Sequence, residues 1–405
     1  MTTPEVLVVG AGPIGAATAR WLAEAGHRVT VVGPAEPESH ATATTPWSGH
    51  YDQGRIGAID AMYVPTVLGT RAMRRFDALH EASGVAFTSA MPLLTAFPAS
   101  PALVADDSTA SWRNRDALLA NAAEFGGAAE VLDAADVAVR FPQLRLPADE
   151  VAVLQADALL VNPRLLTEAE LLLAGKAGAT RLEDQVTALE RDGSRWRARL
   201  RGGAPVEADR VVVAVGAYTN ASGLLAPYAP GRLDTHVFGC TIVLLEVDGP
   251  DAADFPGYMF SSDHHGGGLV TPPRQYPDGR WYLKCAGGEL VDHPLGSADE
   301  IDAWVRTGGS AAEVDFFRDL VASALPRVRV GRALTKPCLP TFNASGLPYV
   351  DRVADGLVVA TEGERGVMMA DEIGRLAAGL AGQDRWVDPI PSHLFAARWA
   401  GYGAA

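Results

Sequence analysis

The sequence predicts an α/β fold in which a parallel sheet is interrupted by an inserted antiparallel α+β segment. The first observation is an apolar strand at residues 6–9, a glycine turn, a helical run to Gly26 and a returning apolar strand at 27–32. The second is that apolar strands ending at glycine recur far along the chain, at 208–217 and 357–363. Parallel strands buried on both faces are continuous apolar runs, so we expect these pieces to share one sheet.

The turn after the first strand has the glycine spacing of a dinucleotide-binding Rossmann unit. Gly10 allows the tight turn, Gly12 lets the backbone approach a pyrophosphate, and Gly15 lets the helix pack close to the strand. With Pro13 and Ile14 they would place a diphosphate on the amides at the helix N-terminus, where the dipole favours negative charge. The alternative is a βαβ unit that binds no nucleotide.

The second strand departs from the Rossmann pattern at its end. An acidic residue normally accepts hydrogen bonds from the adenosine ribose there, but this chain has Gly33, and Glu36 is the nearest carboxylate. No arginine follows the strand to bind the 2′-phosphate of NADP, so the missing acidic residue does not indicate NADP as the cofactor. We therefore expect a nucleotide site near Gly33 with a weakened ribose contact.

The other elements follow in chain order. They are a largely helical stretch at 66–140, a helix at 165–174, strands at 181–189 and 196–200, short antiparallel strands such as 240–246 and 281–285, and a helix at 371–382. This order predicts two domains, each assembled from separated segments. The nucleotide-binding domain comprises 1–88, 145–225 and 326–405, and the substrate domain comprises 89–144 and 226–325.

Composition excludes several classes of protein. The 405 residues are 48% hydrophobic and 20% charged, and no apolar run approaches the roughly 18 residues of a membrane span. A net charge of −15 argues against nucleic acid and anionic membranes as partners. The three cysteines are widely spaced, and the N-terminus lacks the basic region of a secretory signal. We expect a cytoplasmic protein, either a monomer or a small homo-oligomer, without a metal site.

The motifs, taken together, resemble the amino-acid oxidase superfamily of flavoproteins, and within it the sarcosine oxidase and N-methyl-amino-acid oxidase branch. The resemblance covers nearly the whole chain and rests on the glycine turn and on residues 48–56, 63–65, 215–217, 282–284, 336–341 and 363–366. It implies FAD as the cofactor and oxidation of an amine. The positions that it assigns to FAD, beyond the glycine turn and Gly33, are Ser48, Arg55, Val186, Gly216, Cys338, Gly363, Arg365, Gly366, Val367 and Met368.

Cys338 is the most specific of these positions. In that branch a cysteine in the frame Lys-x-Cys-x-x-Thr is joined through sulfur to the flavin 8α-methyl, and Cys338 stands in that frame between Lys336 and Thr341. A nearby cation such as Lys336 would favour the reactive thiolate. The resemblance therefore implies covalent FAD, which would also make the missing acid at Gly33 tolerable. The alternative is that Cys338 is a small buried core residue.

The resemblance also implies catalytic residues. Lys284 matches the lysine at which oxygen is reduced, where a fixed cation stabilises developing negative charge. Arg55 matches an arginine near the flavin ring, and His50 and Tyr51 precede it as candidates for a hydrogen bond to the amine or to water. The alternatives are a strand-end surface lysine, a loop salt bridge for Arg55 and a core tyrosine.

The substrate side departs from the resembled branch. Two cations hold the substrate carboxylate there, but the corresponding positions are Ala58 and Met368. Burying a carboxylate without a cation is costly, so either Arg365 replaces the clamp or the substrate lacks a free carboxylate. We also expect Tyr258 in the substrate pocket. His264 and His265 are read as part of an entrance loop and not as a metal site.

These inferences predict a flavin-dependent oxidase. A hydride would pass from the carbon next to an amine nitrogen to FAD, giving an imine, and O₂ would be reduced to H₂O₂. The substrate is expected to be a secondary or cyclic amine or an amino-acid derivative, not sarcosine itself. Two alternatives stay open: an FAD-dependent dehydrogenase or desaturase of a biosynthetic intermediate, and a non-catalytic flavin-binding protein.

Overall fold

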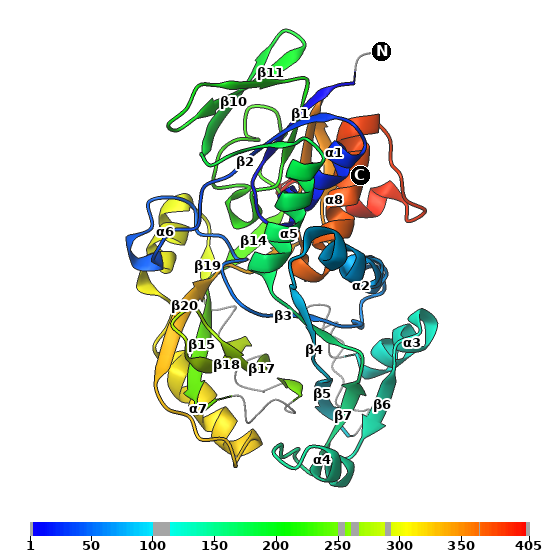
Figure 1. Cartoon of the computed structure of the whole chain (residues 1–405), viewed down its shortest axis with the longest axis vertical. Coiled ribbons are helices and arrows are strands. Elements are labelled where there is room, and N and C mark those ends of the chain that lie inside the picture. The colour runs from blue at the N-terminus through cyan, green and yellow to red at the C-terminus, as the bar shows by residue number, and fades with distance from the viewer. Residues whose placement is uncertain are drawn as a thin grey trace.

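A computed structural model of the chain describes residues 3–99, 114–249, 256–260, 267–287, 293–363 and 365–401. The chain forms two layered domains, with the N-terminus in the upper one and the large antiparallel sheet in the lower one (Figure 1). None of the helices in the described ranges is both long and apolar enough to cross a membrane.

The upper domain is built on the expected parallel sheet. Its strand order is β22 (Val350–Ala354), β23 (Leu357–Ala360), β13 (Arg210–Val213), β1 (Glu5–Val9), β2 (Arg28–Val32) and β9 (Thr180–Leu182). All neighbouring strands pair in parallel except β22, which runs antiparallel to β23 at the edge. The three apolar segments predicted to share a sheet, near residues 6, 210 and 357, are adjacent in it, which confirms the α/β fold class.

Two different layers cover this sheet. On one face, the helices α1 (Pro13–Glu24), α5 (Pro163–Lys176) and α8 (Gly366–Gln383) pack together. On the other face lies a three-stranded sheet of β10 (Val186–Asp192), β11 (Arg195–Leu200) and β12 (Val206–Ala208). Side chains of a strand alternate between its faces. Val6 and Val8 join the core under the helices, whereas Leu7 and Val9 join the core around Trp196 of β11.

The lower domain is built on an eight-stranded sheet. Its order is β20 (Ala333–Cys338), β15 (Cys240–Val247), β18 (Trp281–Gly287), β17 (Gly268–Gln275), β16 (Gly257–Phe260), β5 (Leu93–Pro98), β7 (Glu150–Gln155) and β6 (Ala129–Leu132). All described pairs are antiparallel except β16 with β5. One face buries a core with α7 (Ala312–Ala324), and the other faces the upper domain.

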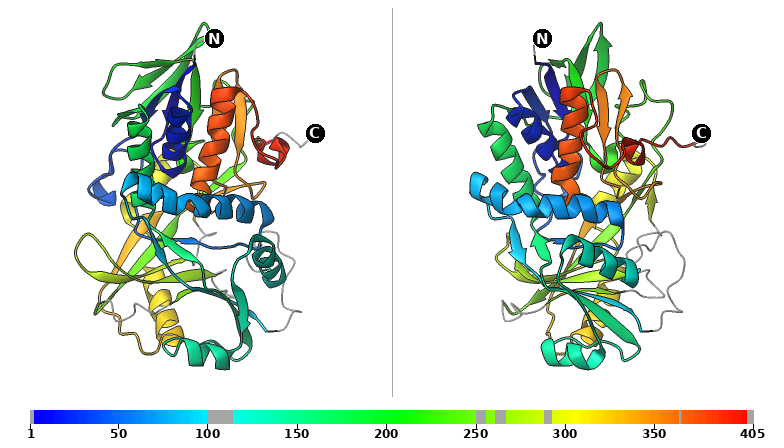
Figure 2. Two further views of the ribbon diagram at one scale, coloured as in Figure 1. Left: turned by 45° about the vertical axis from the view of Figure 1, so that its right-hand side comes forward. Right: turned by 90° about the vertical axis from the view of Figure 1, so that its right-hand side faces the viewer.

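The remaining elements join the two domains or extend them. They are two three-stranded sheets, β3 (Arg55–Gly57) with β8 (Leu159–Val161) and β4 (Thr88–Ala90), and β19 (Pro294–Leu295) with β14 (Thr235–Phe238) and β21 (Thr341–Asn343), and helices α2 (Tyr63–Ser83), α3 (Arg115–Phe125), α4 (Ala134–Arg140) and α6 (Ala298–Thr307). Helix α2 crosses between the upper and lower domains, as the two views of Figure 2 show. It packs against α5 and α8.

Three expectations about the elements need correction. Residues 66–140 contain the helices α2, α3 and α4, but β4, β5 and β6 also lie within them. The alanine-rich composition hid short apolar strands such as 93–98. The predicted strand at 181–189 is two strands in different sheets, β9 and β10. The domain boundaries expected at 145 and 326 assign β7 and β20 to the upper domain, whereas both strands pair in the lower sheet.

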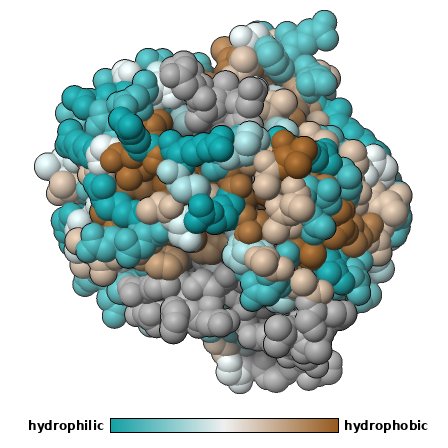
Figure 3. Space-filling view, turned by 90° about the horizontal axis from the view of Figure 1, so that it is seen from below, coloured by the Kyte–Doolittle hydropathy of each residue, from teal (hydrophilic) through white to brown (hydrophobic). Residues whose placement is uncertain are grey.

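The surface of the lower domain mixes polar and apolar residues. Hydrophobic residues are interspersed with hydrophilic ones on the face seen from below in Figure 3. Val131 on β6 and Val139 on α4 are the large hydrophobic side chains of this region that are exposed in the described part of the chain, at 43% and 81%. Single exposed hydrophobic residues of this kind are common on soluble proteins.

A buried ion cluster fastens the helices of the upper domain. Arg20 of α1 is 4% exposed and binds Glu170 of α5 and Asp371 of α8 with separate guanidinium nitrogens. The indole nitrogen of Trp21 also donates to Asp371 over 2.9 Å. Three helices meet at this guanidinium. Removing its charge would leave Glu170 buried without its cation, whereas Asp371 would keep its contact with Arg75.

We predict that Arg20→Met lowers the free energy of unfolding by about 3–5 kcal/mol, the usual result of removing one member of a buried ion pair. Urea denaturation followed by circular dichroism measures the change. Arg28→Met is the matched control, because Arg28 is 81% exposed in its pair with Glu5, and such exposed pairs contribute less than about 1 kcal/mol. Equal losses in the two variants would contradict the role given to Arg20.

Candidate active site

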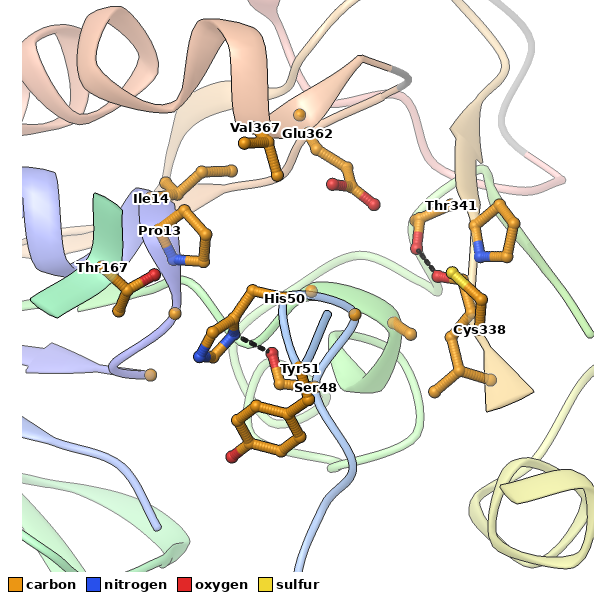
Figure 4. A pocket seen from close by; sticks show the side chains of 18 of the residues that line it. Pro13, Ile14, Ser48, His50, Tyr51, Thr167, Cys338, Thr341, Glu362 and Val367 are labelled. Atoms are coloured by element: carbon orange, nitrogen blue, oxygen red, sulfur yellow. Dashed lines mark hydrogen bonds between the residues drawn. The ribbon is translucent and has the colours of Figure 1, made fainter. Parts of the chain in front are cut away.

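One large cavity joins the two domains. Its volume is about 1360 Å³, and its wall contains the glycine turn, the start of α8, the segment 44–61 and the upward face of the eight-stranded sheet. Figure 4 shows Pro13 and Ile14 of the turn on one side of this space and Cys338 on another, with the Glu362 carboxylate directed into it. The predicted site residues that line it are Gly10, Gly12, Pro13, Ile14, Gly33, Ser48, His50, Tyr51, Arg55, Ala58, Val186, Gly216, Lys284, Cys338, Arg365, Gly366, Val367 and Met368.

The glycine turn brings α1 unusually close to β1. A Cβ atom on Gly15 would lie 1.8 Å from the carbonyl oxygen of Gly10, so only glycine fits at that position. Gly10 itself has φ of 106°, which a side chain rarely adopts. Gly15 therefore allows the close packing of the turn but does not line the cavity. The backbone of Gly12, by contrast, forms part of the cavity wall.

Gly33 is also required by close packing. A Cβ atom there would lie 2.6 Å from both the backbone nitrogen and the Cβ of Ala11, so the turn has closed over the space that an acidic side chain would need. Glu36, three residues later, lines the cavity and accepts a hydrogen bond from Nε of Arg164 over 2.8 Å and a second one from Nη2. Glu36 is thus a carboxylate on the cavity wall that a residue of α5 holds in place.

Arg164 lies in the first turn of α5, and the local sequence fixes its position. The side chain of Asn162 caps the helix by accepting from the backbone nitrogens of Arg164 and Leu165, each over 3.1 Å, and Pro163 occupies the first helical position. Nη1 of Arg164 is buried and has no hydrogen-bond partner among the described residues. A donor of that kind on a cavity wall is available to a ligand oxygen.

His50 lies beside the glycine turn. Its Nδ1 is 2.5 Å from Oγ of Ser48, and it would lie 3.6 Å from a Cβ built on Gly12. Burial, followed by the positive charges of Arg164 and Arg55, lowers the pKa of His50 to about 3. The imidazole is neutral near pH 7, and its place is at the dinucleotide end of the cavity.

Tyr51 belongs to an aromatic group on the cavity wall. Its ring meets those of Trp47 and His50 edge to face, at centroid distances of 5.2 and 4.5 Å. Burial, with the charge of Glu36 adding to it, raises the pKa of the Tyr51 phenol to about 12. The phenol therefore stays protonated at physiological pH and can donate a hydrogen bond.

Lys284 and Arg55 meet at a carboxylate that sequence reasoning did not single out. Nζ of Lys284 lies 2.5 Å from Oδ2 of Asp52, and Nη1 of Arg55 binds the same oxygen. Lys284 is 3% exposed and Asp52 is 4% exposed. The expected cation is therefore at the cavity, not at a solvated strand end, and it lies there as part of an ion triad.

Cys338 ends β20 and is partly buried at the cavity. Nη2 of Arg55 lies 3.8 Å from its sulfur. Lys336, the cation expected to assist this thiol, instead donates to the backbone oxygen of Tyr51 over 3.2 Å. The cation that contacts the sulfur is thus Arg55, because residues two apart on a strand share a face but lie about 7 Å apart along it.

The part of the cavity expected to receive the substrate includes apolar side chains. Ala58 and Met368 line it, and the Met368 side chain packs toward Gly69 of α2. Arg365, the candidate replacement cation, has a left-handed φ of 55° and donates from Nε to Asp60 Oδ2 over 2.6 Å. Its charge is therefore already balanced by a neighbouring carboxylate.

The sequence matches the family of FAD dependent oxidoreductases over residues 5–380. The chain belongs to this family. No curated protein matches it in sequence.

Solved structures show the same fold for this FAD-dependent oxidoreductase. A point variant of NikD, described as an unusual amino acid oxidase essential for nikkomycin biosynthesis, is 22% identical, with all of both chains covered and a TM-score of 0.79. Iminodiacetate oxidase from Chelativorans sp. BNC1 is 18% identical over 97% of this chain and 99% of its own, at a TM-score of 0.69. L-proline dehydrogenase from P. horikoshii is 16% identical over 97% and 96%, also at 0.69.

Tyr258 is not a pocket residue of this flavoprotein. It lies on β16, where alternate side chains face opposite sides of the sheet. Met259 faces the cavity, whereas Tyr258 and Phe260 are buried in the core that α7 covers. Gly363 likewise does not line the cavity; it lies in the turn between β23 and α8, with a φ of 81°. His264 and His265 lie outside the described residues.

The oxidoreductase cavity contains residues that sequence reasoning missed. Asp52, Arg164, Asp60 and Gln155 are brought to it or beside it by the fold. The Gln155 amide holds the backbone of Ile59, accepting from its nitrogen over 2.8 Å and donating to its oxygen over 3.0 Å. Each of Asp52, Asp60 and Gln155 has a partner that is distant in the sequence, which local spacing does not signal. No group of three or more histidine, cysteine or acidic residues that could hold a metal was found in the described ranges.

Proposed function

We propose that this FAD-dependent oxidoreductase is an oxidase that acts on the CH–NH bond of an amine and transfers electrons to O₂. The observation that carries this proposal is one cavity with the glycine turn at one end and Lys284, Arg55 and Cys338 together at the other. The amine and amino-acid oxidases among the structural neighbours share the fold and support the same class of reaction.

The cavity fits FAD on its own geometry. It runs without interruption from the Gly12 backbone to Cys338, and its dinucleotide end offers the free amides of α1 and the unpartnered Nη1 of Arg164. We assign the diphosphate to the turn and the flavin ring to the region between Arg55 and Cys338. When bound, FAD supplies the redox chemistry by accepting a hydride equivalent from the amine.

The residues around the ring act by charge and position. Lys284 holds a fixed cation in a dry site, where it stabilises negative charge that develops on oxygen. If FAD is bound, its reduced form would supply two electrons and one proton and solvent a second proton, so that O₂ would leave as H₂O₂. Arg55 contacts the Cys338 sulfur and can favour its thiolate, the form that would attack an electrophilic flavin in covalent attachment.

The substrate side favours an amine without a free carboxylate. Ala58 and Met368 offer no charge, and Arg365 is paired with Asp60. A carboxylate buried there would lose its hydration and gain no unpaired cation, at a cost of several kcal/mol. We therefore propose a secondary or cyclic amine, or an amino-acid derivative whose carboxylate is masked.

The adenosine end supports a substitute for the missing acid. Glu36 is held in two hydrogen bonds by Arg164, and both side chains line the cavity beyond Gly33. We propose that Glu36 accepts hydrogen bonds from the ribose, while Arg164 fixes the carboxylate and offers Nη1 to a cofactor oxygen. A carboxylate delivered three residues later would perform the task that Gly33 has no space for.

Paired amines that differ only in a carboxylate test the proposed reaction. Mixed anaerobically with the holoenzyme, the carboxylate-free member is expected to bleach the visible flavin band at least about tenfold faster, since each 1.4 kcal/mol is tenfold in rate. Met368→Lys is the matched variant and should raise the rate with the carboxylate member. Faster bleaching by the amino acids in the wild type would show that Arg365 leaves Asp60 to bind them, and bleaching by no member would overturn amine oxidation.

Cys338→Ala is expected to release the flavin. After acid precipitation the wild type should keep its yellow colour in the pellet, and the variant should lose FAD to the supernatant, because the thioether is absent. Cys240→Ala is the control, since Cys240 lies directly opposite Cys338 on β15 and should leave the attachment intact. Flavin released from the wild type would show that the cofactor is not covalent.

In the Cys338→Ala variant FAD would bind without a covalent bond, so the affinity of the protein for FAD can be measured. There Glu36→Gln should raise the Kd of the apoprotein for FAD about five- to tenfold, as expected for a lost hydrogen bond of about 1 kcal/mol to an ionised group. Fluorescence quenching of added FAD provides the measurement. Glu38→Gln, an exposed change that is not on the cavity wall, should have no effect, and an equal Kd in both variants would refute the ribose contact.

A further inference from the structure

Asp52 is a buried carboxylate with contacts from every side. It is 4% exposed and accepts from Nζ of Lys284 at 2.5 Å, from Nη1 of Arg55, and from Oη of Tyr276 over 3.1 Å. Oδ1, the oxygen that accepts from Tyr276, also accepts from the backbone nitrogen of Gln53 over 2.8 Å. Four donors converge on one carboxylate, so its charge and position are closely defined.

Asp52 separates two cations that would otherwise repel each other in a dry site. Lys284 comes from β18 in the lower domain, whereas Arg55 begins β3 and is also fastened by the carbonyl oxygen of Gly49 over 2.6 Å. Burial, and then the charge of Arg55, lowers the pKa of the Lys284 ammonium, and Asp52 acts in the opposite direction. Burial alone would raise the pKa of Asp52, but Lys284 and Arg55 hold it below its usual range.

Among the remaining groups near Lys284, the charge of Cys338 also raises the pKa of the ammonium, but less than Asp52 does. A second contact of Nζ is the carbonyl oxygen of Gly54, at 2.5 Å, which is neutral. The ionisable groups that face this region from the neighbouring elements are Arg55, Lys336 and Cys338, Cys240, and Tyr276. Burial, followed by the charge of Cys338, raises the pKa of the Cys240 thiol to about 12, so that thiol stays neutral.

We propose that Asp52 is a positioning residue for the oxygen reaction, which fixes the Lys284 ammonium at the cavity wall and balances the repulsion from Arg55. The proposal rests on the proposed role of Lys284 in reducing O₂. The two cations share one anion, so the triad keeps a net positive charge of one beside the site of oxygen reduction. Without the carboxylate, Lys284 would lose its proton at a lower pH and the ammonium would lose its anchor.

The oxidative half-reaction tests this without any knowledge of the amine. The flavin of the holoenzyme is reduced by light under anaerobic conditions and mixed with O₂ in a stopped-flow instrument between pH 6 and 10. The reoxidation rate of the wild type should fall as Lys284 deprotonates. In Asp52→Asn this fall should come at least one pH unit lower, giving a rate about tenfold slower at pH values between the two transitions.

Two variants separate charge from shape. Tyr276→Phe removes one hydrogen bond to Asp52 but no charge, and it should keep the pH profile of the wild type. Asp52→Glu retains the charge and should return the profile toward the wild type. An Asp52→Asn enzyme with the wild-type rate at every pH, alongside a slow Lys284→Met enzyme, would overturn the proposal for Asp52 alone.

Lys284→Met separates the proposed oxidase function of Lys284 from the proposed role of Asp52. If this variant reoxidises as fast as the wild type, the proposed oxidase function of Lys284 fails together with the role of Asp52. Should Asp52→Asn not fold, the double variant Asp52→Asn/Lys284→Met removes both charges. The double variant should reoxidise as slowly as Lys284→Met alone, because Asp52 acts through Lys284. A further fall would show that Asp52 acts by another route and would refute the proposal.

Discussion

The close approach of α1 to β1 is the constraint on which the rest of the structure depends. Gly15 leaves no space between the first turn of the helix and the Gly10 carbonyl, which a Cβ atom would approach to 1.8 Å. The helix therefore starts at the edge of the sheet, and its free amides open into the cavity. The same contact sets where α1 meets α5 and α8, and the buried Arg20 cluster forms where these three helices converge.

Most of the upper domain could be predicted from local sequence. The strands near residues 6, 210 and 357 are apolar runs bounded by glycine, and their parallel pairing follows from that pattern. The lower domain was harder to predict, because its strands are short and some lie in alanine-rich sequence that resembles a helix. The positions of β7 and β20 depend on partners that are distant in the chain, which composition does not reveal.

The cavity residues also divide into those that local sequence predicts and those that it does not. Lys284 and Cys338 stand in motifs, and the fold places both at the cavity. Tyr258 was misplaced because its neighbours gave no sign of which face of β16 would be buried. Asp52 was overlooked because its importance comes from Lys284, which lies more than 200 residues away and on another domain. The role of a charged side chain depends on its neighbours in space, and the sequence shows only its neighbours along the chain.

The position of β20 has a consequence for the order of assembly. The contact of Cys338 with Arg55 requires both that β20 is paired with β15 in the lower sheet and that Arg55 is in place at the start of β3. A bond from this sulfur to a cofactor held by the glycine turn would therefore form last, in a chain that is already complete. Such a bond would tie the two domains together through the cofactor and would mark the molecules that had assembled correctly.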